Sequence, residues 1–307
     1  MPRRDTLSAN LNLANCSLRL ISAMQQITVL QALHQARREI GDTDARMLLQ
    51  NVLNVSHAHL IAHADQELNP EQARHFHLLV VRRLHGEPVA YLMGKREFYS
   101  LDFKVTPAVL IPRPETELLV DLALERIPTD RPCKVLDLGT GSGAIAITIA
   151  KHRPLADIIA VDSSAAAAAI AKMNAEQLNV DNVRIITSDW FHGLAGQRFD
   201  IVVSNPPYIA EGDPHLTQGD LRFEPRTALT TGDDGFECIR FIVASASAHL
   251  VEGGALLLEH GYNQAEVCRQ LLSKADFGGV FSHPDLAGIA RVSGGVRGSF
   301  SMEAVRI

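Results

Sequence analysis

The chain has 307 residues, which is enough for about two domains of ordinary size. Apolar residues make up 46% of it and charged residues 21%, a globular composition that excludes disordered, collagenous and fibrous classes. The net charge of −6 is uneven: residues 1–100 carry eleven Lys and Arg against nine Asp and Glu, while the rest carry eighteen against twenty-six, and this acidic main body argues against direct binding of nucleic-acid phosphates.

The first 23 residues are rich in Asn, Ser and Leu and contain a single acidic residue, Asp5. They lack the compact apolar segment and the small-residue cleavage site of a secretory signal. We expect residues 1–23 to form a disordered tail. A transit segment and a true start at Met24 are alternatives that stay open.

Residues 24–86 show only helical patterns. Thr28 can cap a helix whose apolar face runs to Ile40, and Gly41 can end it. A second helix opens at Asp42, and Asn69-Pro70-Glu71 has the order of cap, first-turn proline and first-turn acid that begins a third. The pattern predicts a small helical bundle.

Residues 87–114 have a different character. The stretch 98–105 alternates between apolar and polar residues as a strand does, and Pro107, Pro112 and Pro114 follow. We interpret this region as a hairpin and a stiff linker.

From residue 115 to 307, apolar strand-like segments alternate with helical ones. This alternation predicts an α/β fold with a doubly wound, mostly parallel sheet. Strands are predicted at 134–138, 157–161, 183–187, 199–204 and 254–258, edge strands around 279–282 and 299–306, and helices at 144–151 and 164–178.

A glycine-rich turn follows the first of these strands, with the sequence Asp137-Leu138-Gly139-Thr140-Gly141-Ser142-Gly143. Glycines permit a sharp turn and a close ligand, and the helix that follows offers free N–H groups at its start. The spacing also fits the relaxed dinucleotide fingerprint, and a tight turn without a ligand stays open.

Acidic residues near the strand ends narrow the choice of ligand. Asp162 ends the second strand, where an acid can accept hydrogen bonds from the ribose of NAD or of S-adenosylmethionine. Asp137 favours S-adenosylmethionine, which is cationic and has no pyrophosphate for an acid to repel. After the third strand, Asp189 could accept from an adenine amino group, and Trp190 could either stack on the adenine or pack in the core.

The fourth strand ends in Ser204-Asn205-Pro206-Pro207-Tyr208, at the sheet edge where ligands of such folds bind. A plain loop explains the prolines and Tyr208, but it does not explain a polar Asn205 at the tip of an apolar strand. The Asn205 side-chain oxygen and the Pro206 carbonyl could accept the two N–H bonds of a planar nitrogen, with Tyr208 against its face. Catalysis would then rest on orientation and electrostatics, without a covalent intermediate.

Together, the glycine turn and Asn205-Pro206-Pro207-Tyr208 resemble class I S-adenosylmethionine-dependent methyltransferases that act on planar nitrogen, including those for adenine and guanine amino groups. Four other segments indicate a narrower family. They are similar to the N5-glutamine methyltransferases of peptide chain release factors, and they comprise residues 86–98, 110–117, 222–225 and 285–288. Ribosomal-protein glutamine methyltransferases typically carry Ser-Pro after the arginine, where this chain has Pro114-Glu115 after Arg113. The resemblance covers about residues 25–300.

The resemblance implies a seven-stranded Rossmann-like methyltransferase sheet at 115–307 and a substrate-docking role for the helical domain at 24–86. It implies transfer of a methyl group from S-adenosylmethionine to the glutamine of the Gly-Gly-Gln loop, which modulates translation termination. Residues 111–117 would cover the site, and either an ion pair or a direct role stays open for Arg113 and Glu115. Together with the reasoning above, it gives a catalytic set of Asn205, Pro206 and Tyr208, a substrate set that adds Pro207, and a cofactor set of Asp137, Gly139, Thr140, Gly141, Ser142, Gly143, Asp162, Asp189, Trp190 and Asn205.

Other functions were weighed against this one. Methylation of an adenine or guanine amino group in DNA or RNA, or of a ribosomal-protein glutamine, stays open as an alternative, as does a domain that only binds a partner. The histidines at 34–85 lack ligand spacing, so no metal is expected. No apolar run reaches the ~18 residues of a membrane span, and four cysteines without a C-x-x-C pair indicate a reducing compartment. We therefore expect a cytoplasmic monomer whose partners are release factors, without direct nucleic-acid or membrane binding.

Overall fold

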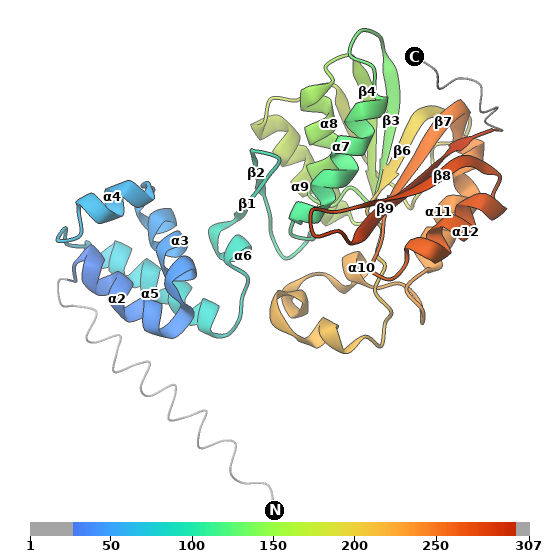
Figure 1. The fold of residues 1–307 in the computed structure, drawn as a ribbon. Helices are drawn as coiled ribbons and strands as arrows, with labels where there is room; N and C mark the ends of the chain where they lie inside the picture. Colours follow the sequence, from blue (N-terminus) through green and yellow to red (C-terminus); the bar gives the residue numbers. More distant parts are fainter. Residues whose placement is uncertain (1–26, 299–307) are drawn as a thin grey trace, which may run out of the picture. The chain divides into compact units, whose positions relative to one another are not determined.

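The computed structural model describes residues 27–298, so the predicted tail at 1–23 and the predicted strand at 299–306 lie outside the described part of the chain. The chain divides into two compact units, Met1–Met93 and Gly94–Ile307, each with a hydrophobic core of its own (Figure 1). None of the helices formed by residues 27–298 is long and apolar enough to cross a membrane.

The first unit is a helical bundle in which capping side chains fix the helix starts. The side chains of Thr28 and Gln31 each accept from the other's backbone N–H, and Asn69 and Gln72 form the same reciprocal pair ahead of Pro70. The apolar faces pack into a core that includes the fully buried Leu48 and Leu49. The helices are α2 (Val29–Ile40), α3 (Asp42–Leu53), α4 (His57–Ala62), α5 (Pro70–Leu84) and α6 (Val89–Met93). This unit therefore continues to Met93, beyond the predicted change of character at residue 87.

A β-hairpin opens the second unit. The alternating run at 98–105 is interrupted by a turn at Tyr99 and Ser100, whose φ angles are +53° and +60°, so β1 (Lys95–Phe98) pairs antiparallel with β2 (Leu101–Lys104). The buried Asn174 side chain connects this hairpin to the glycine turn, because its Oδ1 accepts from Lys104 N at 2.7 Å and its Nδ2 donates to Ser142 O at 2.8 Å.

The main sheet has seven strands in the order β5-β4-β3-β6-β7-β9-β8, which confirms the predicted α/β class. Strands β3 to β7 run parallel, and β9 and β8 add antiparallel pairs at one edge. Alternate side chains of one strand face opposite layers: Val135 packs in the core with α7, α8 and α9, and Leu136 packs in the core with α11 and α12. The sheet therefore lies between two layers of helices (Figure 1).

The strands are β3 (Cys133–Leu138), β4 (Ala156–Asp162), β5 (Val183–Thr187), β6 (Phe199–Ser204), β7 (Leu250–Glu259), β8 (Phe277–Pro284) and β9 (Ala290–Arg297). The α-helices are α7 (Glu117–Arg126), α8 (Ala144–His152), α9 (Ala165–Gln177), α10 (Arg226–Leu229), α11 (Glu237–Ala246) and α12 (Ala265–Lys274). Short 3-10 helices occur at Pro114–Thr116, Pro214–Thr217, Gly219–Phe223 and Ser247–His249.

The antiparallel edge differs from the sequence prediction. β7 begins at Leu250 rather than at residue 254, and β9, which the sequence pattern did not predict, lies between β7 and β8. β9 contains Gly294, where a Cβ atom would lie 2.6 Å from the Leu256 carbonyl oxygen. The neighbouring strand approaches so closely that only glycine fits, and this glycine masks the strand pattern.

Candidate active site

The predicted motifs converge on one pocket at the carboxyl ends of β3, β4 and β6. The pocket is partly open to solvent. The predicted site residues that line it are Gly139, Gly141, Asp162, Asp189, Trp190, Asn205 and Pro207. The predicted residues that do not line it are Asp137, Thr140, Ser142, Gly143, Pro206 and Tyr208.

The glycine turn is held against the end of β4. The backbone N–H groups of Gly139 and Thr140 both donate to the Val161 carbonyl at 2.9 Å. Gly141 borders the pocket, and no atom lies within 4 Å of the place where its Cβ would be. Gly143 instead begins α8 and faces Ile147 of that helix, so it serves packing rather than pocket lining.

Asp162 has a carboxylate that is oriented by the backbone. Its Oδ2 accepts from Gly141 N at 2.9 Å and its Oδ1 accepts from Ser164 N at 2.8 Å. Each carboxylate oxygen can accept a second hydrogen bond, so the group keeps capacity for a ribose hydroxyl. Burial raises its pKa, and the two backbone donors oppose that change.

Asp137 lies behind the glycine turn and is fully buried. The Thr140 hydroxyl donates to its Oδ2 at 2.6 Å, whereas its Oδ1 has no hydrogen-bond partner within residues 27–298. Burial raises the pKa of Asp137 to about 7. An incompletely satisfied acid behind the turn, with Asp162 and Asp189 on the pocket wall, suits a cation that carries hydroxyl groups and disfavours a phosphate. These residues fit S-adenosylmethionine.

Trp190 borders both the core and the pocket, so stacking on the adenine stays a prediction. Its φ of +47° is rare for an aromatic residue. The ring packs partly against the core of the α11 and α12 layer, and it also borders the pocket beside Gly139, where a Cβ would lie 3.7 Å from its Cζ3. Asp189 lies next to it with a largely exposed side chain.

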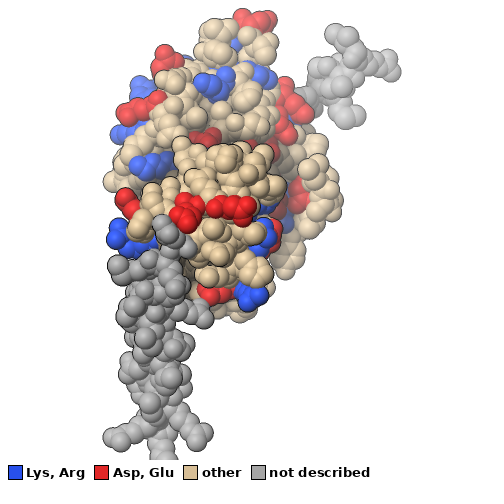
Figure 2. All heavy atoms as spheres, turned by 90° about the vertical axis from the view of Figure 1, so that its left-hand side faces the viewer, with Lys and Arg blue, Asp and Glu red and all other residues tan. Residues whose placement is uncertain are grey.

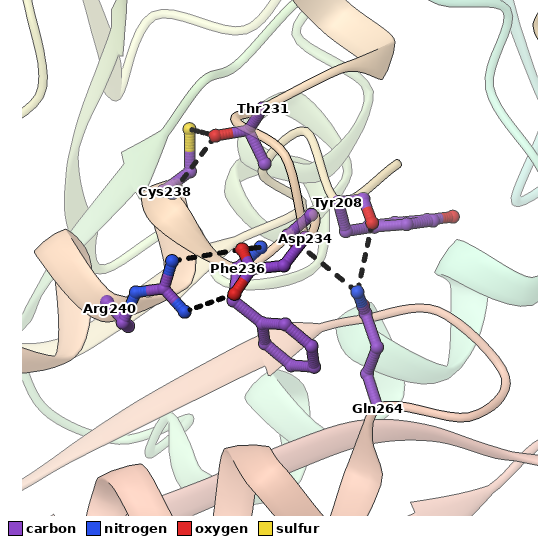
Figure 3. A network of polar contacts seen from close by, with 8 residues as sticks. Tyr208, Thr231, Asp234, Phe236, Cys238, Arg240 and Gln264 are labelled. Atoms are coloured by element: carbon purple, nitrogen blue, oxygen red, sulfur yellow. Dashed lines mark hydrogen bonds and ion pairs between the residues drawn. The ribbon is translucent and has the colours of Figure 1, made fainter. Parts of the chain in front are cut away.

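The Asn-Pro-Pro-Tyr segment is held by residues from three other elements. Asn205 Nδ2 donates to Thr116 Oγ1 at 3.2 Å, which turns the Oδ1 acceptor away from Thr116. The Tyr208 hydroxyl donates to Glu259 Oε1 at 3.4 Å. Gln264 Nε2 donates to the Tyr208 carbonyl at 3.0 Å, at the opposite end of this residue from its hydroxyl (Figure 3).

A glycine in the loop between α10 and α11 also contacts this segment. Gln264 Nε2 lies 3.4 Å from the Gly235 carbonyl, and a Cβ at Gly235 would lie 2.5 Å from the Tyr208 carbonyl oxygen. The loop that holds Asp234 and Phe236 therefore approaches the Tyr208 backbone closely (Figure 3).

Ser163, Ser164, Ala167 and Ser188 also line the pocket, as do two segments that the sequence did not predict as pocket lining. These two segments contribute Ala108, Val109, Leu110, Pro225, Thr227 and Ala228. Arg113 pairs with Glu224 and not with Glu115, and Ile111 N donates to the same Glu224 carboxylate at 3.3 Å. The predicted covering segment, 111–117, thus anchors this wall while residues 108–110 line it.

Comparisons with known proteins agree with this geometry. Residues 27–94 match the family described as PrmC N-terminal domain, and residues 116–221 match the family described as methyltransferase small domain. A 16S rRNA N2 methyltransferase of T. thermophilus, solved in complex with AdoMet and guanosine, has the same fold, with a TM-score of 0.50 and 22% identity over 66% of this chain and 50% of that one.

Curated relatives are far more similar. A protein of Burkholderia pseudomallei is 53% identical over 82% of this chain and 90% of its own length. A protein of Escherichia coli is 47% identical over 88% of this chain and 95% of its own length. Both are named release factor glutamine methyltransferase. The chain therefore belongs to the release factor glutamine methyltransferase family and is an S-adenosylmethionine-dependent methyltransferase.

Proposed function

We propose that this protein methylates the side-chain amide nitrogen of the glutamine in the Gly-Gly-Gln loop of peptide chain release factors, and so modulates translation termination. The observation that carries the proposal is the position of Asn205. It is a polar residue at the tip of an apolar strand, it lines the pocket, and its Nδ2 is engaged by Thr116. Bound S-adenosylmethionine supplies the electrophilic methyl group.

The chemical difficulty is that an amide nitrogen is a poor nucleophile, because its lone pair is delocalised. Asn205 Oδ1 and the Pro206 carbonyl accept its two N–H bonds, which fixes the nitrogen and increases its electron density. Pro207 and Tyr208 shape the slot around the planar group. These residues act by orientation and electrostatics and need no covalent intermediate.

The cofactor-binding residues divide into two groups. Asp162, Asp189, Trp190, Gly139 and Gly141 border the pocket and would contact the cofactor directly. The others, Asp137, Thr140, Ser142 and Gly143, support the turn from behind, and Asp137 adds negative charge.

Nucleic-acid methylation uses the same planar-nitrogen chemistry, but the close relatives favour glutamine. On the face shown in Figure 2, Lys and Arg are interspersed with Asp and Glu, and the described residues form no continuous basic patch there. This face therefore offers no basic stripe for nucleic-acid phosphates, and the net charge of −6 points the same way. We further propose that the protein acts as a monomer in the cytoplasm, where release factors work.

The replacement Asn205→Ala tests the function. Because Asn205 sits at a strand tip, the fold should survive while the turnover number falls about a hundredfold or more. The assay uses labelled S-adenosylmethionine, intact release factor and a release factor whose Gly-Gly-Gln glutamine is alanine. Asn205→Asp should not restore turnover, since its charge alters how the site holds a cationic cofactor. Near-normal turnover with either enzyme variant would refute the proposal. So would methylation of the release factor that carries alanine in place of the Gly-Gly-Gln glutamine.

A further inference from the structure

Two neighbouring strands, β6 and β7, end side by side where the Asn-Pro-Pro-Tyr segment begins. Ser204 of β6 pairs with Leu258 of β7, so the next residues, Asn205 and Glu259, follow at the same edge of the sheet. Glu259 is 2% exposed and pairs on its other side with Val292 of β9. A carboxylate is therefore buried beside the residue that we propose holds the substrate amide.

The surroundings of Glu259 are hydroxyl groups rather than a direct ion pair. The Tyr208 hydroxyl donates to Oε1 at 3.4 Å, and a hydrogen bond from Thr116 also favours the ionised form. Oε2 has no hydrogen-bond partner in the part of the chain that the structure describes. Arg291 acts on Glu259 only through its charge, and its Nε donates to Asp285 at 3.0 Å.

Such a carboxylate is a poor choice for packing alone. Burial without an ion pair is costly, and it raises the pKa of Glu259 to about 7. An apolar residue of similar size would fill the same space without that cost. The carboxylate does offer what a packing residue lacks, namely acceptors for two hydroxyl donors at once.

Thr116 links Glu259 to Asn205 through hydrogen bonds. Its Oγ1 accepts from Asn205 Nδ2 at 3.2 Å, so its single proton is left to donate to Glu259. The direction of donation is then fixed from Asn205 through Thr116 to Glu259. A donor in place of Glu259 would reverse the Thr116 hydroxyl, and the Asn205 amide would turn its Nδ2 toward the substrate.

We propose that Glu259 and Thr116 are positioning residues that orient the Asn205 amide and the Tyr208 ring, so that Asn205 presents its oxygen to the substrate glutamine. The inference rests on the proposed role of Asn205 and extends it to the residues behind the site. Neither residue contacts the reacting atoms. Their effect should therefore appear in turnover rather than in binding.

The test uses the full-length enzyme, S-adenosylmethionine and intact release factor. Thr116→Val keeps the shape and removes the hydroxyl, whereas Thr116→Ser keeps the hydroxyl. Glu259→Met keeps the approximate size of the side chain and removes both acceptors. The matched controls are Thr148→Val, which removes a buried hydroxyl without a partner within residues 27–298, and Glu252→Met, at an exposed position of β7.

Thr116→Val and Glu259→Met should lower kcat by about tenfold to a hundredfold, with KM for the release factor and the affinity for S-adenosylmethionine nearly unchanged. Thr116→Ser and both controls should stay near wild-type kcat. The losses from Tyr208→Phe and Glu259→Met should be less than multiplicative, because both remove the same hydrogen bond.

Three results would overturn the inference: normal kcat in Thr116→Val, an equal loss in Thr116→Ser, or an equal loss in Thr148→Val. If Glu259→Met does not fold, the comparison of Thr116→Val with Thr116→Ser still tests the positioning role. The Asn205→Ala variant separates the two proposals. If it is inactive while Thr116→Val is normal, only the positioning role falls; if it is active, the proposed amide site falls as well.

Discussion

The carboxylate of Asp162 orders the glycine turn through Gly141 and also borders the pocket. Asp162→Ala removes both functions, so the affinity for S-adenosylmethionine should fall by about 1–3 kcal/mol. Asp162→Asn keeps one oxygen for one of the two backbone donors. Its affinity for S-adenosylmethionine should lie between those of the wild type and the alanine variant. Titration calorimetry measures both, and unchanged affinity in the alanine variant would remove Asp162 from the cofactor site.

Asp137 predicts a dependence of cofactor binding on pH. Its pKa is raised from 3.8 to about 7 by burial, so near neutral pH it is only partly ionised. A cationic cofactor favours the ionised form, so the affinity should rise with pH up to about 7 and then level off. Binding below that pH should release protons.

Asp137→Asn supplies the control for this behaviour, since it has a similar shape and does not titrate. Its affinity should vary less with pH than that of the wild type. Ionisation of the buried Asp137 also costs stability as pH rises from 3.8 to about 7, a loss that the variant should not share. Superimposable curves of affinity against pH for the two proteins would show that the Asp137 charge is not used.

At the scale of elements, the Arg113–Glu224 pair joins two segments that form a wall of the pocket. The Glu224 side chain is fully buried and that of Arg113 is 29% exposed. Arg113→Met would leave a buried charge without its partner, which costs about 3 kcal/mol or more. The melting temperature and the affinity for S-adenosylmethionine should both fall.

Adding Glu224→Gln to Arg113→Met should recover part of the melting temperature, because no uncompensated charge then remains. The control is Arg240→Met, which breaks the Arg240–Asp234 pair where both side chains are about half exposed, and it should change little. A double variant no better than Arg113→Met alone would mean that buried charge is not the cause.

Elements with strong local patterns could be predicted from the sequence. β5 and β6 have the predicted bounds, and α8 and α9 agree to within about a residue, since their apolar residues repeat with the period of the element. β9 could not be predicted, because Ser293-Gly294-Gly295 has the composition of a turn. Its glycines are explained only by neighbouring strands that are distant in sequence.

The residues of the site likewise divide into those that a local sequence pattern predicts and those that depend on distant contacts. Asp162 and Asn205 could be predicted because a local motif places each at a strand end. Thr116 and Glu224 lie in segments that the resemblance singles out, but the contacts of Thr116, Glu224 and Glu259 could not be predicted. Each of the three acts on a partner far away in the sequence: Asn205, Arg113 and Tyr208. No local pattern marks such pairs, and the folded sheet is what brings them together.

At the scale of the whole molecule, the two units have separate cores and separate tasks. Every residue that lines the pocket lies in the unit Gly94–Ile307. The core of the helical unit contains only residues of that unit, among them Leu48 and Phe76. Removing residues 1–93 should therefore leave the cofactor site able to form.

The proposed docking role of the helical unit predicts a substrate-dependent effect of that deletion. Contacts away from the reacting centre lower the free energy of the bound transition state only for substrates large enough to make them. Deleting residues 1–93 should reduce kcat/KM for the intact release factor much more than for a peptide containing the Gly-Gly-Gln loop. The affinity for S-adenosylmethionine, measured by calorimetry, should stay near that of the full-length enzyme and so report a folded catalytic unit. With that control satisfied, equal losses for factor and peptide would exclude docking by the helical unit.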